Sequence, residues 1–480
     1  MPRNGSVSRR RRIPLALLAI SLALAVGAVA APMSSARGLK LGFGDAGTFQ
    51  SPDPSVRSTW FNRAAAEGAK VVRISVFWRA VAQSKPAHPA NPADPAYDFS
   101  AVDASVRAAH ARHLDVMFTV EDAPDWAEGK NRPPGDAVPP GAWKPNPNAF
   151  GRFAQALGKR YSGHYDGLPR VSQYEVWNEP NITKFLAPQW QGKHATSPDL
   201  YRNLLNAFYK GVKKSQHGAK VIAGAMSPFG DARTDPLDPS RPRLRPLVFL
   251  RKLLCLKNNL KPSKCPTKPH FDILSQHPLN FNKPPRYRPY NPNDVQVATF
   301  GKVKRTLRAA ERAKHVRPGG HRPLWATEYI WYTNPPNPTG VSPMTQARWI
   351  EFGFYLLWKE GASVVLNYPL RDEPRDPTQP PGRWGTSGTF YYNGSRKPSF
   401  QSFRFPFVGD RTSKKKVRIW SKAPTSGRLK IQRAHGKGWR TVKRVHVHRG
   451  EVVTPTIRLR SKAKLRGEVG GTTSLVWNQR

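Results

Sequence analysis

Two apolar segments of this chain each end in a glutamate, and these glutamates are the residues best suited to chemistry. Val171–Trp177 is followed by Asn178 and Glu179, and Pro323–Thr327 is followed by Glu328. The Val, Tyr, Thr and Trp residues of these segments favour strands, and a proline directly after Glu179 ends the first strand. Hydrolysis of a glycosidic bond with retained configuration needs two carboxylates, one to donate a proton and one to attack the sugar. The pattern therefore predicts Glu179 and Glu328 as a catalytic pair.

Two further residues have types and positions that fit this chemistry. Asn178 is placed to donate a hydrogen bond to the 2-hydroxyl of a bound sugar, a contact that strengthens in the transition state. Arg73 lies in the apolar segment 71–77, and a cation there would keep the pKa of Glu328 low. Three other acidic residues are weaker candidates: Glu121, Asp122 and Glu175. Glu175 precedes Glu179 by four residues, which puts it roughly 13 Å deeper along a strand.

Alternating strand-like and helix-like segments must position these side chains. Eight apolar strand candidates follow one another at 39–43, 71–77, 115–120, 171–177, 220–225, 271–276, 324–328 and 363–368. Between them, apolar residues recur at helical spacing, most clearly over 100–112, 148–161, 200–215 and 345–360. Repeated units of this kind predict an α/β fold, a (β/α)8 TIM barrel over residues 39–405, in which catalytic residues lie at the C-terminal ends of the strands.

The last part of the chain has a different pattern. Residues 406–480 consist of short alternating segments separated by Gly or Pro, which indicates a small antiparallel all-β sandwich domain. It shows no sign of catalytic residues.

The motifs around the two glutamates resemble those of a known family. Trp-Asn-Glu-Pro-Asn at 177–181, together with Ala-Thr-Glu-Tyr at 326–329, resembles the retaining glycoside hydrolases of clan A, with family 39-like and family 5-like members the most similar. The resemblance covers about residues 39–405. It implies a (β/α)8 enzyme in which Glu179 is the acid/base on strand 4 and Glu328 is the nucleophile on strand 7.

The same resemblance implies several substrate-binding residues. Arg73 matches the active-site arginine of strand 2, and His277, which follows strand 6, matches a residue that contacts the nucleophile in relatives. Trp126 follows strand 3, where an aromatic residue often lines the cleft, and Tyr329 adjoins the nucleophile motif. Clan members commonly carry a Trp at the end of strand 8. This chain has none there, so we expect Trp384 in the next loop to replace it.

The N-terminus has the pattern of an export signal. Four arginines at 9–12 precede an uncharged, Ala- and Leu-rich run over 13–31, with an Ala-Val-Ala cleavage candidate at 28–30. We therefore expect residues 1–31 to be a signal peptide and the mature protein to be secreted or associated with the cell envelope. The alternative is a retained membrane anchor, since the run is about long enough to span a bilayer. In an exported chain, Cys255 and Cys265 are expected to form a short-loop disulfide.

The charge of the chain is strongly positive. The formal net charge is +47, and residues 406–480 alone hold 20 Lys and Arg against three acidic residues. Such a field attracts anionic partners, so an anionic cell-wall polymer or another acidic polymer is expected to bind the C-terminal domain. A surface that is simply basic and solvated is the alternative. Nucleic acid is not an expected partner, because no recognised nucleic-acid motif occurs.

The leading hypothesis is a retaining β-glycosidase that acts on an oligosaccharide or polysaccharide. The alternative is a non-catalytic carbohydrate-binding or cell-wall-binding protein on a barrel scaffold, since a fold does not imply a function. The paired glutamates favour catalysis, because a pure binding protein has no need of two opposed carboxylates. The chemistry requires no metal and no organic cofactor. The sugar, its linkage, exo or endo action and the oligomeric state are left open.

Overall fold

The structure is a computed structural model that describes residues 37–134, 137–231, 243–376 and 384–479. The predicted signal peptide at 1–31 lies outside these ranges. The described residues form one compact unit. Within the described ranges, no helix has both the length and the hydropathy needed to cross a membrane.

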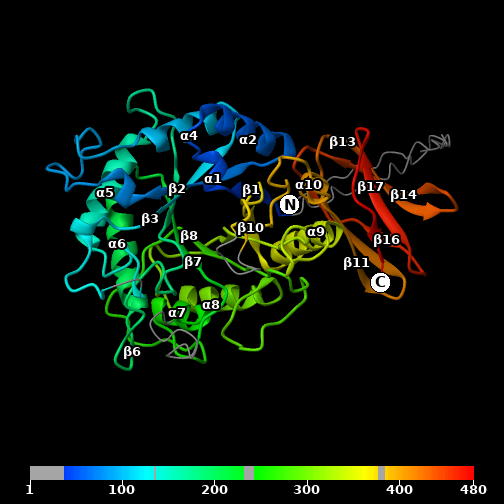
Figure 1. Cartoon of the computed structure of the whole chain (residues 1–480). Helices are drawn as coiled ribbons and strands as arrows, with labels where there is room; N and C mark the ends of the chain where they lie inside the picture. The colour runs from blue at the N-terminus through cyan, green and yellow to red at the C-terminus, as the bar shows by residue number, and fades with distance from the viewer. Residues whose placement is uncertain (1–36, 135–136, 232–242, 377–383, 480) are drawn as a thin grey trace, which may run out of the picture. The chain divides into compact units, whose positions relative to one another are not determined.

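Eight parallel strands close into a barrel, in the order β1-β10-β9-β8-β7-β4-β3-β2. The predicted (β/α)8 fold is confirmed, and Figure 1 shows its strands running in colour from blue β1 to yellow β10. The barrel strands are β1 (Lys40–Gly44), β2 (Val71–Phe77), β3 (Asp115–Glu121), β4 (Gln173–Val176), β7 (Lys220–Met226), β8 (Ile273–Gln276), β9 (Leu324–Ala326) and β10 (Ala362–Asn367). The first and last strands pair directly, with Lys40 opposite Val364.

Helices follow the barrel strands along the chain. The longer ones are α2 (Pro54–Glu67), α4 (Ser100–His110), α5 (Pro147–Arg160), α6 (Ser197–Ser215), α7 (Pro246–Leu253), α8 (Gly301–Arg312), α9 (Pro343–Glu360) and α10 (Ser399–Arg404). Short helical turns occur at α1 (Ala46–Phe49), α3 (Trp78–Val81), η1 (Asp125–Ala127) and η3 (Val297–Thr299), and a small hairpin joins β5 (Trp190–Gln191) to β6 (His194–Ala195).

The ends of the helices follow from local sequence. In α9, the Ser342 hydroxyl accepts a hydrogen bond from the Thr345 N–H, and a proline occupies the first turn. The helix ends at Gly361, whose φ of 116° is a left-handed conformation that glycine adopts without strain. These caps satisfy backbone groups that the helix itself leaves without partners.

The C-terminal part is a β-sandwich, as predicted. One sheet contains β11 (Phe407–Ser413), β12 (Lys416–Lys422), β15 (Val452–Val453) and β16 (Thr456–Arg458), and the other contains β13 (Gly427–His435), β14 (Gly438–Val447), β17 (Lys464–Val469), β18 (Thr472–Thr473) and β19 (Trp477–Asn478). Apolar side chains from both sheets form its core, among them Ile419, Ile431 and Leu465.

The sandwich packs against one barrel helix. The ring of Trp420 on β12 lies 5.9 Å from that of Tyr355 and 6.1 Å from that of Trp358, both on α9. The Tyr355 hydroxyl donates a 2.6 Å hydrogen bond to Asp410 Oδ2. These contacts give α9 an apolar face on the sandwich side as well as one on the barrel side.

The predicted disulfide is confirmed. Cys255 and Cys265 are bonded, with their Cα atoms 5.3 Å apart. The bond joins residues ten positions apart in the segment between α7 and β8. This segment leads from a helix into the next strand, whereas the two glutamates follow strands.

Candidate active site

The backbone turns sharply after β4 and presents Asn178 and Glu179 at the barrel mouth. Trp177 and Glu179 have positive φ values of 66° and 35°, which residues other than glycine seldom adopt. The Glu179 N–H donates to the Ala225 carbonyl at 3.0 Å, and the buried Trp177 ring donates to the Phe185 carbonyl. Strain of this kind persists where the surrounding structure holds it, often at functional sites.

Arg73 of β2 links the two sequence motifs. Its Nη1 donates to Glu328 Oε1 at 2.5 Å, and its Nη2 donates to Asn178 Oδ1 at 2.9 Å. Its Nε donates to Thr119 Oγ1 at 2.5 Å. A planar guanidinium can serve three acceptors at once in this way. Glu328 is therefore held by a charged hydrogen bond, two residues beyond the end of β9.

His277, directly after β8, lies beside both glutamates. Its Nδ1 is 3.2 Å from Glu179 Oε1 and 3.7 Å from Glu328 Oε2. Oxygen atoms of the two carboxylates and a His277 nitrogen all lie within 4.8 Å of one another. This spacing is close to the 5–5.5 Å typical of retaining glycosidases and shorter than the spacing of inverting ones.

Charge around Glu328 favours its ionised form. Burial by itself would raise the pKa of Glu328, but His277 and Arg73 beside it hold the pKa below its usual value. Burial would likewise lower the pKa of His277, but Glu328 and Glu179 raise it above its usual value. An ionised carboxylate at Glu328 is the state that a nucleophile requires.

Glu175 occupies the barrel interior. It is fully buried, and its oxygens accept hydrogen bonds from Thr119 at 2.9 Å, Ser275 at 2.8 Å and Thr327 at 2.7 Å. Arg73 Nε lies 3.3 Å from the same carboxylate. These hydrogen bonds fix Glu175 inside the barrel, where its carboxylate helps to hold the Arg73 guanidinium in place.

Glu179, His277 and Glu328 are also residue types that bind metals. Arg73, however, already supplies the positive charge beside Glu328 at 2.5 Å. A divalent cation would have to compete with this guanidinium for the same carboxylate. The arrangement thus fits acid–base and nucleophilic chemistry by the side chains themselves.

The structure adds residues that the motifs did not single out. Tyr368, directly after β10, lies close enough to Glu328 and Arg73 for their charges to act on it, and burial is the main cause that raises its pKa. Burial, helped by Glu373, Glu328 and Glu179, raises the pKa of Tyr332 to about 12. Tyr368 thus stands at the end of the eighth barrel strand, the position where the resemblance to clan A led us to look for a Trp. Tyr368 was the last residue of the predicted eighth strand, 363–368, and it directly follows the observed β10.

Glu121 at the end of β3 is a third carboxylate beside the pair. Burial, opposed by Arg73 and helped by Glu328, raises its pKa to about 8. It lines a hollow between the β3 and β4 loops. The residues around this hollow are Phe77, Glu121, Asp122, Pro140, Gly141, Ala142, Lys184 and Phe185. After burial, His277 and Arg73, the charge of Lys184 also lowers the pKa of Glu328.

Three further predicted binding residues make contacts within the protein itself. Tyr329 is fully buried, and its hydroxyl donates to the Ile350 carbonyl at 2.8 Å, so its ring belongs to the core behind β9 rather than to a substrate site. Trp126 packs edge-on against Trp78 and donates to the Ala82 carbonyl. Trp384 is mostly buried and donates to the Asp376 carbonyl. Trp126 and Trp384 support loops of the mouth through these contacts.

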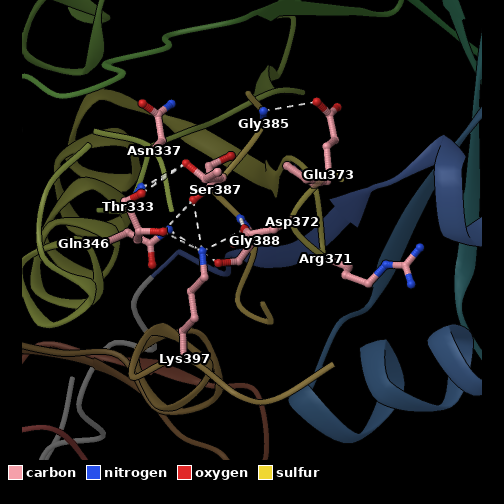
Figure 2. Close-up of polar contacts among 12 residues, drawn as sticks. Thr333, Asn337, Gln346, Arg371, Asp372, Glu373, Gly385, Ser387, Gly388 and Lys397 are labelled. Carbon is pink, nitrogen blue, oxygen red and sulfur yellow. Dashed lines mark hydrogen bonds and ion pairs between the residues drawn. The ribbon is translucent and has the colours of Figure 1, made fainter. Parts of the chain in front are cut away.

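A buried ion pair holds the loop after β10. Figure 2 shows the Lys397 amine among polar groups of two loops: Nζ lies 2.7 Å from Asp372 Oδ1, 2.8 Å from Thr333 Oγ1 and 3.0 Å from the Thr386 carbonyl. Lys397 and Asp372 are both fully buried. The pair therefore ties the loop after β9, which carries Tyr332, to the loop after β10, which carries Glu373.

Fold and site together define a (β/α)8 barrel with two facing glutamates at its mouth. No protein-family model matches the chain. No curated protein matches it either. Its fold is similar to that of a family 39 glycoside hydrolase from the gut symbiont Bacteroides cellulosilyticus WH2, with a TM-score of 0.54 and 16% identity over 88% of this chain and 81% of that chain. A family 39 β-xylosidase from Caulobacter crescentus has a TM-score of 0.48 at 17% identity, over 83% of this chain and 84% of that chain, a likeness too weak to argue from.

The resemblance to family 39-type barrels is confirmed for the fold. At 16% identity a structural likeness shows shared architecture alone. The activity of this chain must therefore be derived from its own residues.

Proposed function

We propose that the protein is a retaining O-glycosyl hydrolase that cleaves β-glycosidic bonds in oligosaccharides or polysaccharides. The observation that carries this proposal is the carboxylate pair. Glu179 and Glu328 approach within 4.8 Å, and Arg73 holds Glu328 in its ionised form. Two carboxylates at this spacing have the geometry of double displacement. The family 39 hydrolase with a similar fold is consistent with this chemistry.

In the first step, Glu328 attacks the anomeric carbon while Glu179 protonates the glycosidic oxygen. The bond between that carbon and oxygen breaks, and a glycosyl ester forms on Glu328. Asn178, oriented by its bond from Arg73, donates its amide N–H to the sugar 2-hydroxyl. In the second step, Glu179 takes a proton from water, which attacks the same carbon and releases Glu328. The two inversions leave the configuration unchanged.

His277 has a positioning role in this scheme. Its Nδ1 lies within hydrogen-bond distance of Glu179 Oε1, at 3.2 Å, and 3.7 Å from Glu328 Oε2. A doubly protonated, cationic imidazole at this position orients Glu179 and adds positive charge beside Glu328.

The test is hydrolysis of a panel of aryl β-glycosides and polysaccharides by the full chain, beside Glu179→Gln and Glu328→Gln. We expect cleavage with retained anomeric configuration, followed by NMR, and a loss of at least about 10³-fold in both variants. Glu468→Gln in the C-terminal domain is the matched control and should keep full activity. Sugar binding without cleavage, kept by both active-site variants, would instead establish the non-catalytic carbohydrate-binding alternative.

We further propose that the protein is exported. The basic and apolar pattern of residues 1–31 supports this, and so does the Cys255–Cys265 disulfide, since such bonds persist in oxidising compartments. N-terminal sequencing of the protein recovered from the culture medium and from membranes is the test. Cleavage after residue 30 would support secretion, whereas an intact N-terminus in the membrane fraction would indicate a retained anchor. Uncleaved protein confined to the cytosol would contradict export.

A further inference from the structure

One concentration of positive charge in the described chain lies at one end of the β-sandwich. There the turn between β11 and β12 meets the segment that joins β16 to β17. Eight cationic residues gather there: Arg411, Lys414, Lys415, Lys416, Arg458, Arg460, Lys462 and Lys464. We call this set the basic end. Residues 411–416 and 458–464 contain no acidic residue.

Main-chain contacts bring these two segments together. Lys416 on β12 pairs directly with Arg458 on β16, so two cations face each other across the sheet. The Leu459 N–H donates to the Lys415 carbonyl at 3.0 Å. The Arg411 guanidinium donates to the carbonyls of Lys414, Leu459 and Ser461 at 3.0–3.1 Å. The cluster therefore rests on a fixed backbone arrangement.

The charges of the basic end are uncompensated. Seven of the eight side chains are exposed and Arg411 is partly exposed, and among the described residues none of the eight forms an ion pair with an acid. Like charges that face each other across strands oppose folding. By contrast, Lys430 on β13 is paired with Glu468 at 2.8 Å. A cluster of unpaired cations of this kind attracts a multiply charged anion.

The residue types in and around the basic end indicate which class of anion it can bind. Residues 411–416 and 458–464 include no aromatic residue on which a nucleic-acid base could stack. Their one large apolar side chain, Leu459, is 3% exposed, so none is available to enter a membrane. Five of the eight cations are lysines, which act as point charges without bidentate geometry. The surface fits a flexible chain with regularly spaced anionic groups.

We propose that the basic end is a binding site for an acidic polysaccharide that carries carboxylates along its length. The choice of a sugar polymer rests on the proposed function. In a protein whose barrel cleaves glycosidic bonds, a second binding site on the same chain raises the local concentration of the substrate at the barrel. The basic end then holds the polymer while the glutamate pair acts on a glycosidic bond.

The test is binding of the full-length Glu179→Gln chain to polygalacturonate, to the same polymer with its carboxylates methyl-esterified, and to double-stranded DNA. We expect polygalacturonate to bind, the esterified polymer to bind at least about tenfold more weakly, and the affinity to fall steeply with salt. Lys414→Glu/Lys415→Glu/Arg458→Glu should weaken binding by roughly tenfold or more. The matched control is Arg428→Glu/Arg444→Glu/Arg449→Glu, which makes the same change in net charge elsewhere on the domain.

Three outcomes would overturn the proposal. Equal losses in the test and control variants would show a response to net charge without a site. Unchanged binding in the test variant would place the site elsewhere. Tighter binding of DNA than of polygalacturonate would identify a different class of polymer. Hydrolysis of a small aryl glycoside by the wild-type barrel tests the proposed activity separately, and the test variant should leave that hydrolysis unchanged.

Discussion

Arg73 connects the electrostatics of the two glutamates with the barrel interior. It contacts Glu328, Asn178 and Thr119 and lies beside Glu175. With His277, it holds the pKa of Glu328 down against the effect of burial. A nucleophile with a depressed pKa stays ionised to lower pH, so the acidic limit of activity reports this contact.

Replacement of Arg73 by Met should move the acidic limb of kcat/KM upward by about 1–3 pH units. Without the cation, Glu328 binds its proton more tightly and must be deprotonated at higher pH before it can attack. The measurement is the pH profile of aryl glycoside hydrolysis. Arg73→Lys keeps the charge and should shift the limb less. An acidic limb at the same pH in wild type and Arg73→Met would rule out Arg73 as the cause.

Glu121 should make the stability of the folded protein depend on pH. Its pKa in the folded chain is about 8, above its value near 4.5 in the unfolded chain, so its contribution is full below pH 4.5 and is lost as the pH rises to about 8. Glu121→Gln keeps the neutral shape and removes this loss, which is on the order of a few kcal/mol. Thermal unfolding of both proteins at pH 5 and pH 8 measures it. A constant difference between the two would contradict the prediction.

The sequence predicted the charged part of the site better than its aromatic part. Glu179, Glu328 and His277 follow strands that are recognisable from their apolar composition, so the closed barrel brings them together. Tyr329 follows a strand just as closely, yet the chain has already turned after Ala326 and directs its ring into the core. Where a side chain points beyond a strand end depends on backbone torsions that a pattern does not contain.

At the scale of elements, strands and amphipathic helices were predicted well because their periodicity is local. The loop after β10 was not, because contacts between distant residues shape it. Lys397 lies 25 residues from Asp372 and 64 residues from Thr333 in the chain, and the three meet in one buried cluster. Trp384, predicted as a cleft residue, is buried by this same loop.

Replacement of Lys397 by Met should lower the free energy of unfolding by about 3–5 kcal/mol, because it leaves Asp372 buried without its partner. The double variant Lys397→Met/Asp372→Leu removes both charges and should recover much of that loss. Denaturant unfolding of the three proteins gives the values. A single variant as stable as wild type would show that the pair does not hold the loop.

At the scale of the whole molecule, barrel and sandwich depend on each other through α9. Tyr355 and Trp358 pack on Trp420, and the ring of Phe352 lies 5.5 Å from that of Trp477. A chain that ends at residue 405 exposes these aromatic side chains together, and exposed apolar patches promote association. We expect this truncated chain to unfold at a lower temperature and to self-associate. Sedimentation and thermal unfolding test this, and a stable monomer would show that the barrel is self-sufficient.

The pairing of β1 with β10 has a consequence for the synthesis of the protein. Lys40 of β1 pairs with Val364 of β10. A ribosome must therefore synthesise almost the entire barrel before β1 can form hydrogen bonds with β10, its second neighbour in the sheet. Contacts this distant in sequence slow folding and leave strand edges open in the meantime. A nascent chain of this protein therefore stays open, and dependent on protection from aggregation, until β10 has emerged.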